Sequence, residues 1–168
     1  HFNAYSFELE SLICQFARYH EASRLVSSHR WGPIQLSQQD DVHYAIEMER
    51  LEKLTIPSAG EYVAILDRVI EMMAAITELH AMTIPVRCFP PELVRDLSLA
   101  REIPITRAYH YDLSPDQFMY RPSLDDSPGK VVLIDFNSSR MAHAEYDNFF
   151  WYMIPGKNYY QPPERRRL

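Results

Sequence analysis

The sequence predicts an α+β domain that is mainly helical and contains one short antiparallel strand pair. Three segments in the first half carry apolar patterns with helical spacing, and a short apolar run at residues 131–134 is typical of a buried strand. The length of 168 residues fits a single domain, and an apolar content of 46% is enough to build a core. We therefore expect residues 1–109 to be mostly helical, with the strand pair after residue 117.

The first predicted helix spans residues 7–27. Ser6 can cap it, because a serine oxygen at that position accepts a hydrogen bond from a free backbone N–H group. Glu8 and Glu10 lie in its first turn, where the helix dipole stabilises negative charge. A second helix is predicted over residues 38–54. Its buried face would comprise Val42, Ala45, Ile46, Leu51 and Leu54.

The third predicted helix, residues 59–82, has the clearest boundaries. Ser58 and Glu61 have the spacing of a capping box, in which each residue satisfies a free N–H group of the other. Apolar residues then follow on several sides of the helix, which indicates burial on more than one face. The residues that we expect to be buried include Leu66, Val69 and Ile76.

Composition limits the classes of partner. The net charge of −6 argues against nucleic acid, because binding to phosphates requires a basic surface. No stretch reaches the roughly 18 apolar residues of a membrane span, so we expect no membrane partner. Cys14 and Cys88 have no metal-binding spacing, and we interpret them as reduced thiols of an intracellular protein, cytoplasmic or nuclear.

Two carboxylates are placed by the strand pair, which we expect to join residues 118–121 and 131–135 through a turn at residues 125–129. Asp135 comes directly after the apolar run, so it should be held at the edge of the core. Asp112 lies in a loop that Pro115 keeps from becoming helical. Such a pair can serve as a general base and a metal ligand.

Three motifs resemble, in the same order, the catalytic centre of the protein-kinase-like fold. Residues 110–117, His-Tyr-Asp-Leu-Ser-Pro-Asp-Gln, are similar to the catalytic loop, which has the pattern His-Arg-Asp-Leu, three residues and Asn. Residues 135–137, Asp-Phe-Asn, resemble the metal-binding Asp-Phe-Gly. Residues 162–164, Pro-Pro-Glu, resemble the Ala-Pro-Glu that ends the activation segment. The resemblance covers residues 110–164 and is looser upstream.

The resemblance implies a site for ATP and Mg²⁺. Asp112 would be the catalytic base, and Asp135 would hold the magnesium ion that bridges the ATP phosphates. Gln117 replaces the asparagine that binds a second metal ion, and its extra methylene group displaces the amide oxygen. His110, Phe136 and Glu164 would have structural roles, with His110 bracing the catalytic loop.

Two further features follow from the same resemblance. Asn137 replaces the glycine of the metal-binding turn, and we expect it to take the left-handed conformation that asparagine tolerates. The helix over residues 59–82 ends with Leu-His, as does the long helix before the catalytic loop in the family. Residues 83–109 would then be an insertion.

Parts of a complete kinase site are not recognisable in this chain. A kinase needs a lysine for the α and β phosphates and a glycine-rich loop above them. None of the three lysines, Lys53, Lys130 and Lys157, follows a strand in the right place, and the four glycines are isolated. We therefore expect a partial domain, from the large lobe, without the small lobe or the late large-lobe helices.

Three hypotheses about function stay open. In the first, the parent protein transfers the ATP γ-phosphate to a hydroxyl group, with protein serine or threonine as the favoured acceptor, and this chain alone is inactive. In the second, the chain is a pseudokinase that binds a protein partner, which the replacement at Gln117 favours. In the third, the parent is a small-molecule phosphotransferase of the aminoglycoside or choline kinase type. The sequence Asp-Leu-Ser-Pro at 112–115 suits this group, but the Pro-Pro-Glu motif argues against it.

Overall fold

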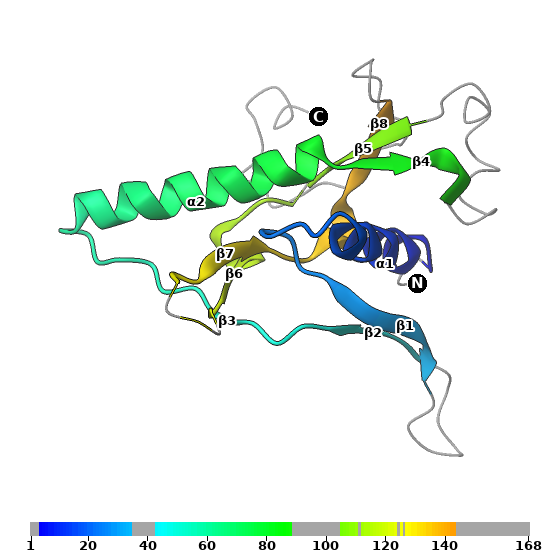
Figure 1. The fold of residues 1–168 in the computed structure, drawn as a ribbon, viewed down its shortest axis with the longest axis horizontal. Coiled ribbons are helices and arrows are strands. Elements are labelled where there is room, and N and C mark those ends of the chain that lie inside the picture. Colours follow the sequence, from blue (N-terminus) through cyan, green and yellow to red (C-terminus); the bar gives the residue numbers. More distant parts are fainter. Residues whose placement is uncertain are drawn as a thin grey trace, which may run out of the picture.

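The computed structural model describes residues 4–34, 43–88, 105–110, 112–123, 125 and 127–143. These residues form an α+β fold of two α-helices and three small antiparallel sheets (Figure 1). The expectation that residues 1–109 are mostly helical, with a single strand pair in the chain, is wrong, because five of the eight strands in the described residues lie before residue 110. No helix in this part of the chain is long and apolar enough to cross a membrane.

Helix α1 (Ala4–Tyr19) ends eight residues before the predicted boundary. Glu21 adopts the left-handed conformation, with φ 53°. The N–H group of Ala22 then donates to the carbonyl of Ala17 at 2.7 Å, and the N–H group of Glu21 donates to Arg18 at 3.0 Å. These two bonds make a Schellman motif, which usually has glycine at the left-handed position. The buried side of α1 comprises Leu9, Leu12, Ile13, Cys14 and Ala17.

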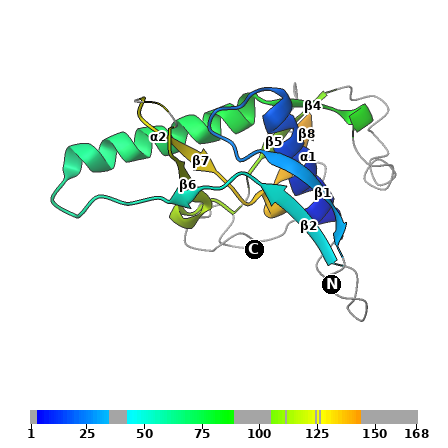
Figure 2. The ribbon, with the colours of Figure 1, turned by 60° about the horizontal axis from the view of Figure 1, so that its bottom comes forward.

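Strands occupy the described part of the segment that we predicted as the second helix, so that prediction is wrong. Strand β1 (Ser28–Ile34) pairs with β2 (His43–Met48) in an antiparallel hairpin that lies beside α1 (Figure 2). Strand β3 (Glu52–Lys53) follows and pairs with a later strand. The residues of β2 also alternate between more and less apolar side chains, and pairing with β1 selects this strand pattern over the helical one.

Helix α2 (Tyr62–Ala81) confirms the third predicted helix but not its predicted burial. The Glu61 carboxylate accepts hydrogen bonds from the Ser58 backbone N–H at 2.8 Å and from its hydroxyl at 2.5 Å. However, Glu61 itself is the N-cap residue and no side chain caps the helix, so the predicted capping box is wrong. Leu66 and Val69 are 61% and 47% exposed, and the prediction that they are buried is wrong. Ile76 is partly buried against the core, and the fully buried residues of the helix are Ala75 and Leu79.

After α2, the chain builds a sheet with the order β4-β5-β8. Its strands are β4 (Thr83–Pro85), β5 (Ile105–Tyr109) and β8 (Arg140–His143). A 3₁₀ turn, η1 (Val86–Cys88), follows β4, and residues 89–104 lie outside the described residues. Part of the expected insertion at residues 83–109 therefore belongs to a sheet.

The predicted strand pair is confirmed. Strand β6 (Phe118–Arg121) pairs with β7 (Lys130–Leu133), and β3 adds to β6 to give the order β3-β6-β7. On the other edge of β7, Leu25 forms a parallel bridge with Leu133. The chain after α1 thus closes this edge, with the Val26 N–H group 3.0 Å from the Leu133 carbonyl oxygen.

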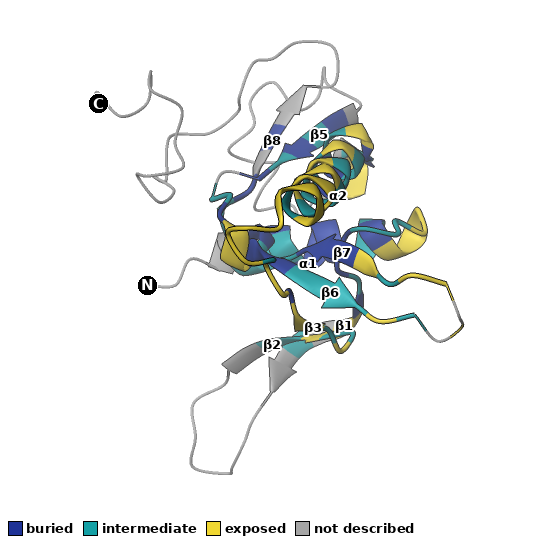
Figure 3. Ribbon diagram, turned by 90° about the vertical axis from the view of Figure 1, so that its left-hand side faces the viewer, coloured by how far each residue is buried: buried dark blue, intermediate teal, exposed yellow. Residues whose placement is uncertain are grey.

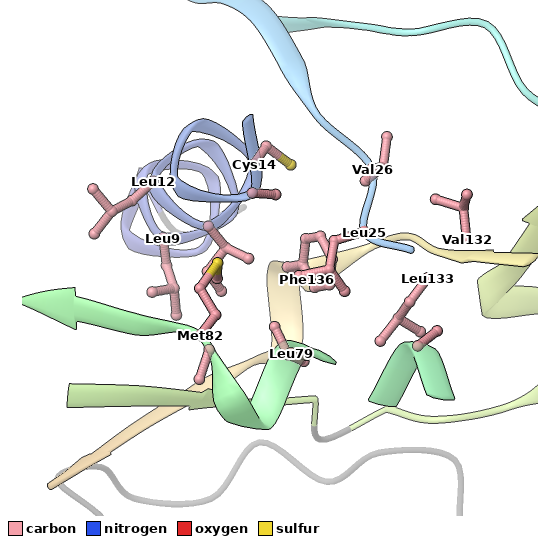
Figure 4. Packing of buried hydrophobic residues seen from close by; sticks show 14 of the residues in the cluster. Leu9, Leu12, Cys14, Leu25, Val26, Leu79, Met82, Val132, Leu133 and Phe136 are labelled. Atoms are coloured by element: carbon pink, nitrogen blue, oxygen red, sulfur yellow. The ribbon is translucent and has the colours of Figure 1, made fainter. Parts of the chain in front are cut away.

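One buried apolar cluster joins α1, the end of α2 and strand β7 (Figure 4). Phe136 is fully buried in it, together with Leu25, Leu79 and Leu133. Cys14 also lies in this cluster, and burial raises the pKa of its thiol, which favours the neutral form. The cluster fixes the end of β7, the strand that precedes Asp135.

Polar contacts fix the loop between α1 and β1. Arg121 donates to the carbonyl of Ser23 at 2.5 Å and to that of Leu25 at 3.0 Å, and it forms an ion pair with Glu49. Burial alone would raise the pKa of Glu49, but hydrogen bonds from Arg121 and Ser27 outweigh it, and the pKa lies below its ordinary value. Glu78 of α2 accepts the Ser23 N–H group at 2.9 Å, which ties the loop to this helix.

Candidate active site

The segments that carry Asp112 and Asp135 lie at the same end of the β6–β7 pair. Because the strands are antiparallel, the first residue of β6 faces the last residue of β7, and Phe118 is the partner of Leu133. The loop with Asp112 leads into β6, and Asp135 follows β7 by two residues. Both aspartates are partly exposed to solvent.

His110 connects these two segments. Its Nε2 atom lies 3.0 Å from the carbonyl oxygen of Ile134, and its Nδ1 atom lies 3.3 Å from the backbone nitrogen of Asp112. A carbonyl only accepts and a backbone N–H only donates, so the ring must donate from Nε2 and accept at Nδ1. This is the neutral Nε2–H tautomer.

The surroundings of His110 favour this neutral form. Burial lowers the pKa of His110 below its ordinary value, although the Ile134 carbonyl and the charges of Asp135 and Asp112 act in the opposite direction. The ring also packs edge-on against Phe136, with 5.8 Å between ring centroids. A neutral ring can satisfy both hydrogen bonds, through which His110 links the Asp112 loop to the end of β7.

A second connection runs through the backbone of Gln117. Its carbonyl accepts the N–H group of Ile134 at 2.9 Å, and its own N–H group donates to Ser114 at 3.0 Å, across the 3₁₀ turn η2 (Pro115–Gln117). The Gln117 side chain is buried. The residue predicted to bind a second metal ion is thus held beside the end of β7 through its main chain.

Asp135 has a left-handed backbone, with φ 62° and ψ 68°. We expected this conformation at Asn137, but Asn137 lies in the 3₁₀ turn η3 (Phe136–Ser138), so that prediction is wrong. A non-glycine residue in this region costs about 1–3 kcal/mol and persists where its surroundings enforce it, which happens often at functional sites. Here the buried Phe136 side chain and the Ile134 hydrogen bonds hold the residues on either side.

Glu10 is a member of this site that we did not predict. Burial and the charge of Asp135 raise the pKa of the Glu10 carboxyl group from 4.5 to about 7, although a hydrogen bond from the Phe136 backbone acts in the opposite direction. The first turns of α1 therefore bring a second carboxyl group to the end of β7. We predicted Glu10 in the first turn of this helix, but α1 begins at Ala4 and its first turn has no acidic residue, so that prediction is wrong. The proximity of Glu10 to Asp135, 125 positions later, was not visible in the sequence.

The described residues do not form a complete metal cage. Among them, no three His, Cys, Asp or Glu side chains are grouped as they would be around a metal ion. Magnesium in phosphotransferases is often bound by one or two carboxylates, with water and phosphate oxygens as the other ligands. Asp135 is a partly exposed carboxylate that fits this smaller set, whereas the Gln117 side chain is a buried amide and fits it poorly. Glu164, for which we predicted a structural role, lies outside the described residues.

Comparison of the chain with known proteins gave no match to a protein-family model, to a curated protein sequence or to a solved structure. Function must therefore be inferred from the site itself.

Proposed function

We propose that residues 110–137 form the base-and-metal part of a phosphotransferase site of the protein-kinase type. The observation that carries the proposal is the pair of hydrogen bonds made by His110. One ring bonds to both carboxylate-bearing segments, so Asp112 and Asp135 are held at one end of the same strand pair. A base and a metal ligand must be positioned together in this way for phosphoryl transfer.

In this proposal, Asp112 accepts the proton of the attacking hydroxyl group, and a protein serine or threonine is the favoured acceptor of the phosphoryl group. Asp135 binds the magnesium ion that bridges the ATP phosphates, and Gln117 is the candidate ligand of a second ion. When bound, magnesium supplies positive charge that stabilises the transferred phosphoryl group. His110 contributes by orienting both segments in its neutral form.

We expect this chain alone to bind Mg-ATP weakly and to transfer no phosphate. Lys130, one of its three lysines, begins β7, whereas Asp135 follows the far end of that strand. Catalysis of phosphoryl transfer depends almost entirely on positioning and charge stabilisation. The complete activity is therefore assigned to the parent protein.

A pseudokinase function is the second candidate, and the burial of Gln117 favours it. A buried amide with an extra methylene group is poorly suited to the octahedral geometry that magnesium requires. In that case the fold would serve to bind a partner, and a small-molecule phosphotransferase remains a further alternative.

Paramagnetic NMR tests the proposed site directly. Mn²⁺ replaces Mg²⁺ and broadens the signals of nearby nuclei, so Mn-ATP should broaden the amide signals of residues 112–117 and 134–137 first. Asp135→Asn should abolish this pattern. Asp125→Asn is the matched control, because Asp125 is an exposed carboxylate in the turn between β6 and β7. In this variant the same amide signals should broaden as in the wild type.

Broadening that is equal in the wild type and in Asp135→Asn would contradict the proposed metal site. Broadening centred elsewhere in the chain would do the same. Micromolar binding of Mg-ATP, measured by calorimetry and lost in Asp135→Asn, would support the site but show that the missing contacts matter less than we expect.

A further inference from the structure

The first three turns of α2 expose an apolar stripe. Its members are 47% to 74% exposed, although side chains of this kind are usually buried. In Figure 1 these turns extend beyond the β6–β7 pair, and Figure 3 shows exposed residues along the helix seen end-on. The stripe comprises Tyr62, Val63, Leu66, Val69, Ile70 and Met73.

The stripe is distinct from the face that α2 buries in the core. At 3.6 residues per turn, its six side chains fall within an arc of about 120°. The residues that face the core, Met72, Ala75, Ile76 and Leu79, fall in another arc, about 100° wide, which begins roughly 20° beyond the edge of the stripe. Helix α2 thus has two apolar faces, and the described part of the chain buries only one.

The exposed area is large enough to indicate an interaction surface. Full burial of one such side chain removes roughly 60–120 Å² of apolar surface from water. Six side chains at these exposures then offer about 200–450 Å². Patches of a few hundred Å² on soluble proteins are often functional.

Charge indicates which partner fits. No charged residue lies within the stripe, but the flank of α2 beside it carries Asp67, which is exposed, and Glu71. Glu78 lies on the same side but beyond the stripe, and it accepts hydrogen bonds from the backbone of Ser23 and Arg24. The only lysine or arginine of α2 is Arg68, and it pairs with Glu71 at 2.6 Å. Because Arg68 balances Glu71, Asp67 gives this border of the stripe its net negative charge.

A second copy of this chain fits less well. In an antiparallel, two-fold symmetric pair of α2 helices, the same flank of each copy would meet at the interface. Asp67, close to the centre of the stripe, would then lie near its own copy. Like charges placed together at an interface weaken binding, which disfavours this pairing.

We propose that this stripe binds an amphipathic helix of a partner protein, with an apolar face and basic residues along one flank. Helices bind such surfaces through side chains spaced three or four residues apart. The basic flank would lie along Asp67 and Glu71. This surface goes beyond the phosphotransferase site and does not depend on it.

Binding of a labelled model peptide tests the proposal by fluorescence anisotropy. The probe is a two-heptad peptide with the repeat Leu-Lys-Lys-Leu-Leu-Lys-Leu, and its counterpart has glutamate in place of each lysine. We expect a dissociation constant of about 10–100 µM for the lysine peptide, and binding at least about tenfold weaker for the glutamate peptide.

Substitutions locate the binding face. Leu66→Glu should weaken binding of the lysine peptide by at least about tenfold. Ala64→Glu adds the same charge at an exposed position away from the stripe, and it should leave binding of this peptide unchanged. If Leu66→Glu does not fold, Ile70→Gln replaces it as the test. Equal binding of both peptides, or an equal effect of both glutamate substitutions, would overturn the proposal. A stable dimer that Leu66→Glu dissociates, seen by analytical ultracentrifugation, would also overturn it and assign the stripe to a second copy.

Discussion

Replacing Glu10 with glutamine should stabilise the protein at alkaline pH. The Glu10 carboxyl group has a pKa of about 7 in the folded protein and 4.5 as its ordinary value. The folded state therefore binds the proton more tightly than the unfolded chain does. The protonated group stabilises the protein below about pH 4.5, and this contribution is lost as the pH rises through about 7. Glutamine resembles the protonated acid and can still accept the Phe136 N–H group.

The size of the effect follows from the two pKa values. At about 1.4 kcal/mol for each tenfold change in proton affinity, ionised Glu10 lowers the free energy of unfolding by about 3 kcal/mol. About a quarter of this loss has already occurred at pH 5, because the unfolded chain ionises there. The stability difference between Glu10→Gln and the wild type should thus grow by about 2–3 kcal/mol from pH 5 to pH 8.

Urea unfolding, followed by circular dichroism at both pH values with a chelator present, measures this difference. Glu52→Gln removes an exposed carboxylate in β3 and is the control, for which the difference should stay the same at pH 5 and pH 8. An unchanged difference for Glu10→Gln would refute the placement of Glu10 beside Asp135.

Three further predictions concern the framework of the site. Leu79→Ala should cost about 2–5 kcal/mol in urea unfolding, because Leu79 is fully buried, and Leu66→Ala should cost less than about 1 kcal/mol; similar costs would contradict the assignment of the two faces of α2. Gly129→Ala should lower the melting temperature, because its Cβ atom would lie 2.5 Å from the backbone oxygen of Arg121, and an unchanged melting temperature would show that this turn can move. Arg121→Gln should cost about 1.5–3 kcal/mol at pH 7. This cost should shrink in acid. The pKa of Glu49 is lowered in the folded protein, so the stability that ionised Glu49 contributes is lost as the pH falls below about 4.5. A cost that does not depend on pH would argue against the ion pair.

Local signals in the sequence predicted the elements whose determinants lie close together in the chain. The apolar spacing over residues 59–82 marked α2, although Glu61 and not Ser58 is its N-cap residue, and the apolar run before Asp135 marked β7. The geometry around His110 also agrees with the bracing role that the resemblance implied.

Long-range contacts decided the features that the sequence did not predict. The segment that becomes β2 has spacing compatible with a helix, and only its pairing with β1 selects the strand. Helix α1 ends in a left-handed Glu21, where no glycine signals the end. The prediction that Leu66 is buried was wrong, because an apolar pattern shows that a helix face can be buried but not which part of the protein covers it.

In the candidate site, too, local motifs were predictable from the sequence and long-range contacts were not. Asp112 and Asp135 could be proposed from motifs, but Glu10 could not, because its proximity to Asp135 depends on the packing of α1 against η3. The left-handed residue proved to be Asp135 instead of Asn137, since the burial of Phe136 sets the direction of the chain after β7.

The tautomer of His110 is the most direct test of whether one ring joins the two carboxylate segments. Two-dimensional ¹H–¹⁵N NMR of the imidazole ring distinguishes the three protonation states by their nitrogen shifts. We predict the neutral Nε2–H form at pH 7, with protonation only below the ordinary histidine value of 6.5. A ring that carries its proton on Nδ1, or that is doubly protonated at pH 7, could not accept the Asp112 N–H group and would contradict the proposed site.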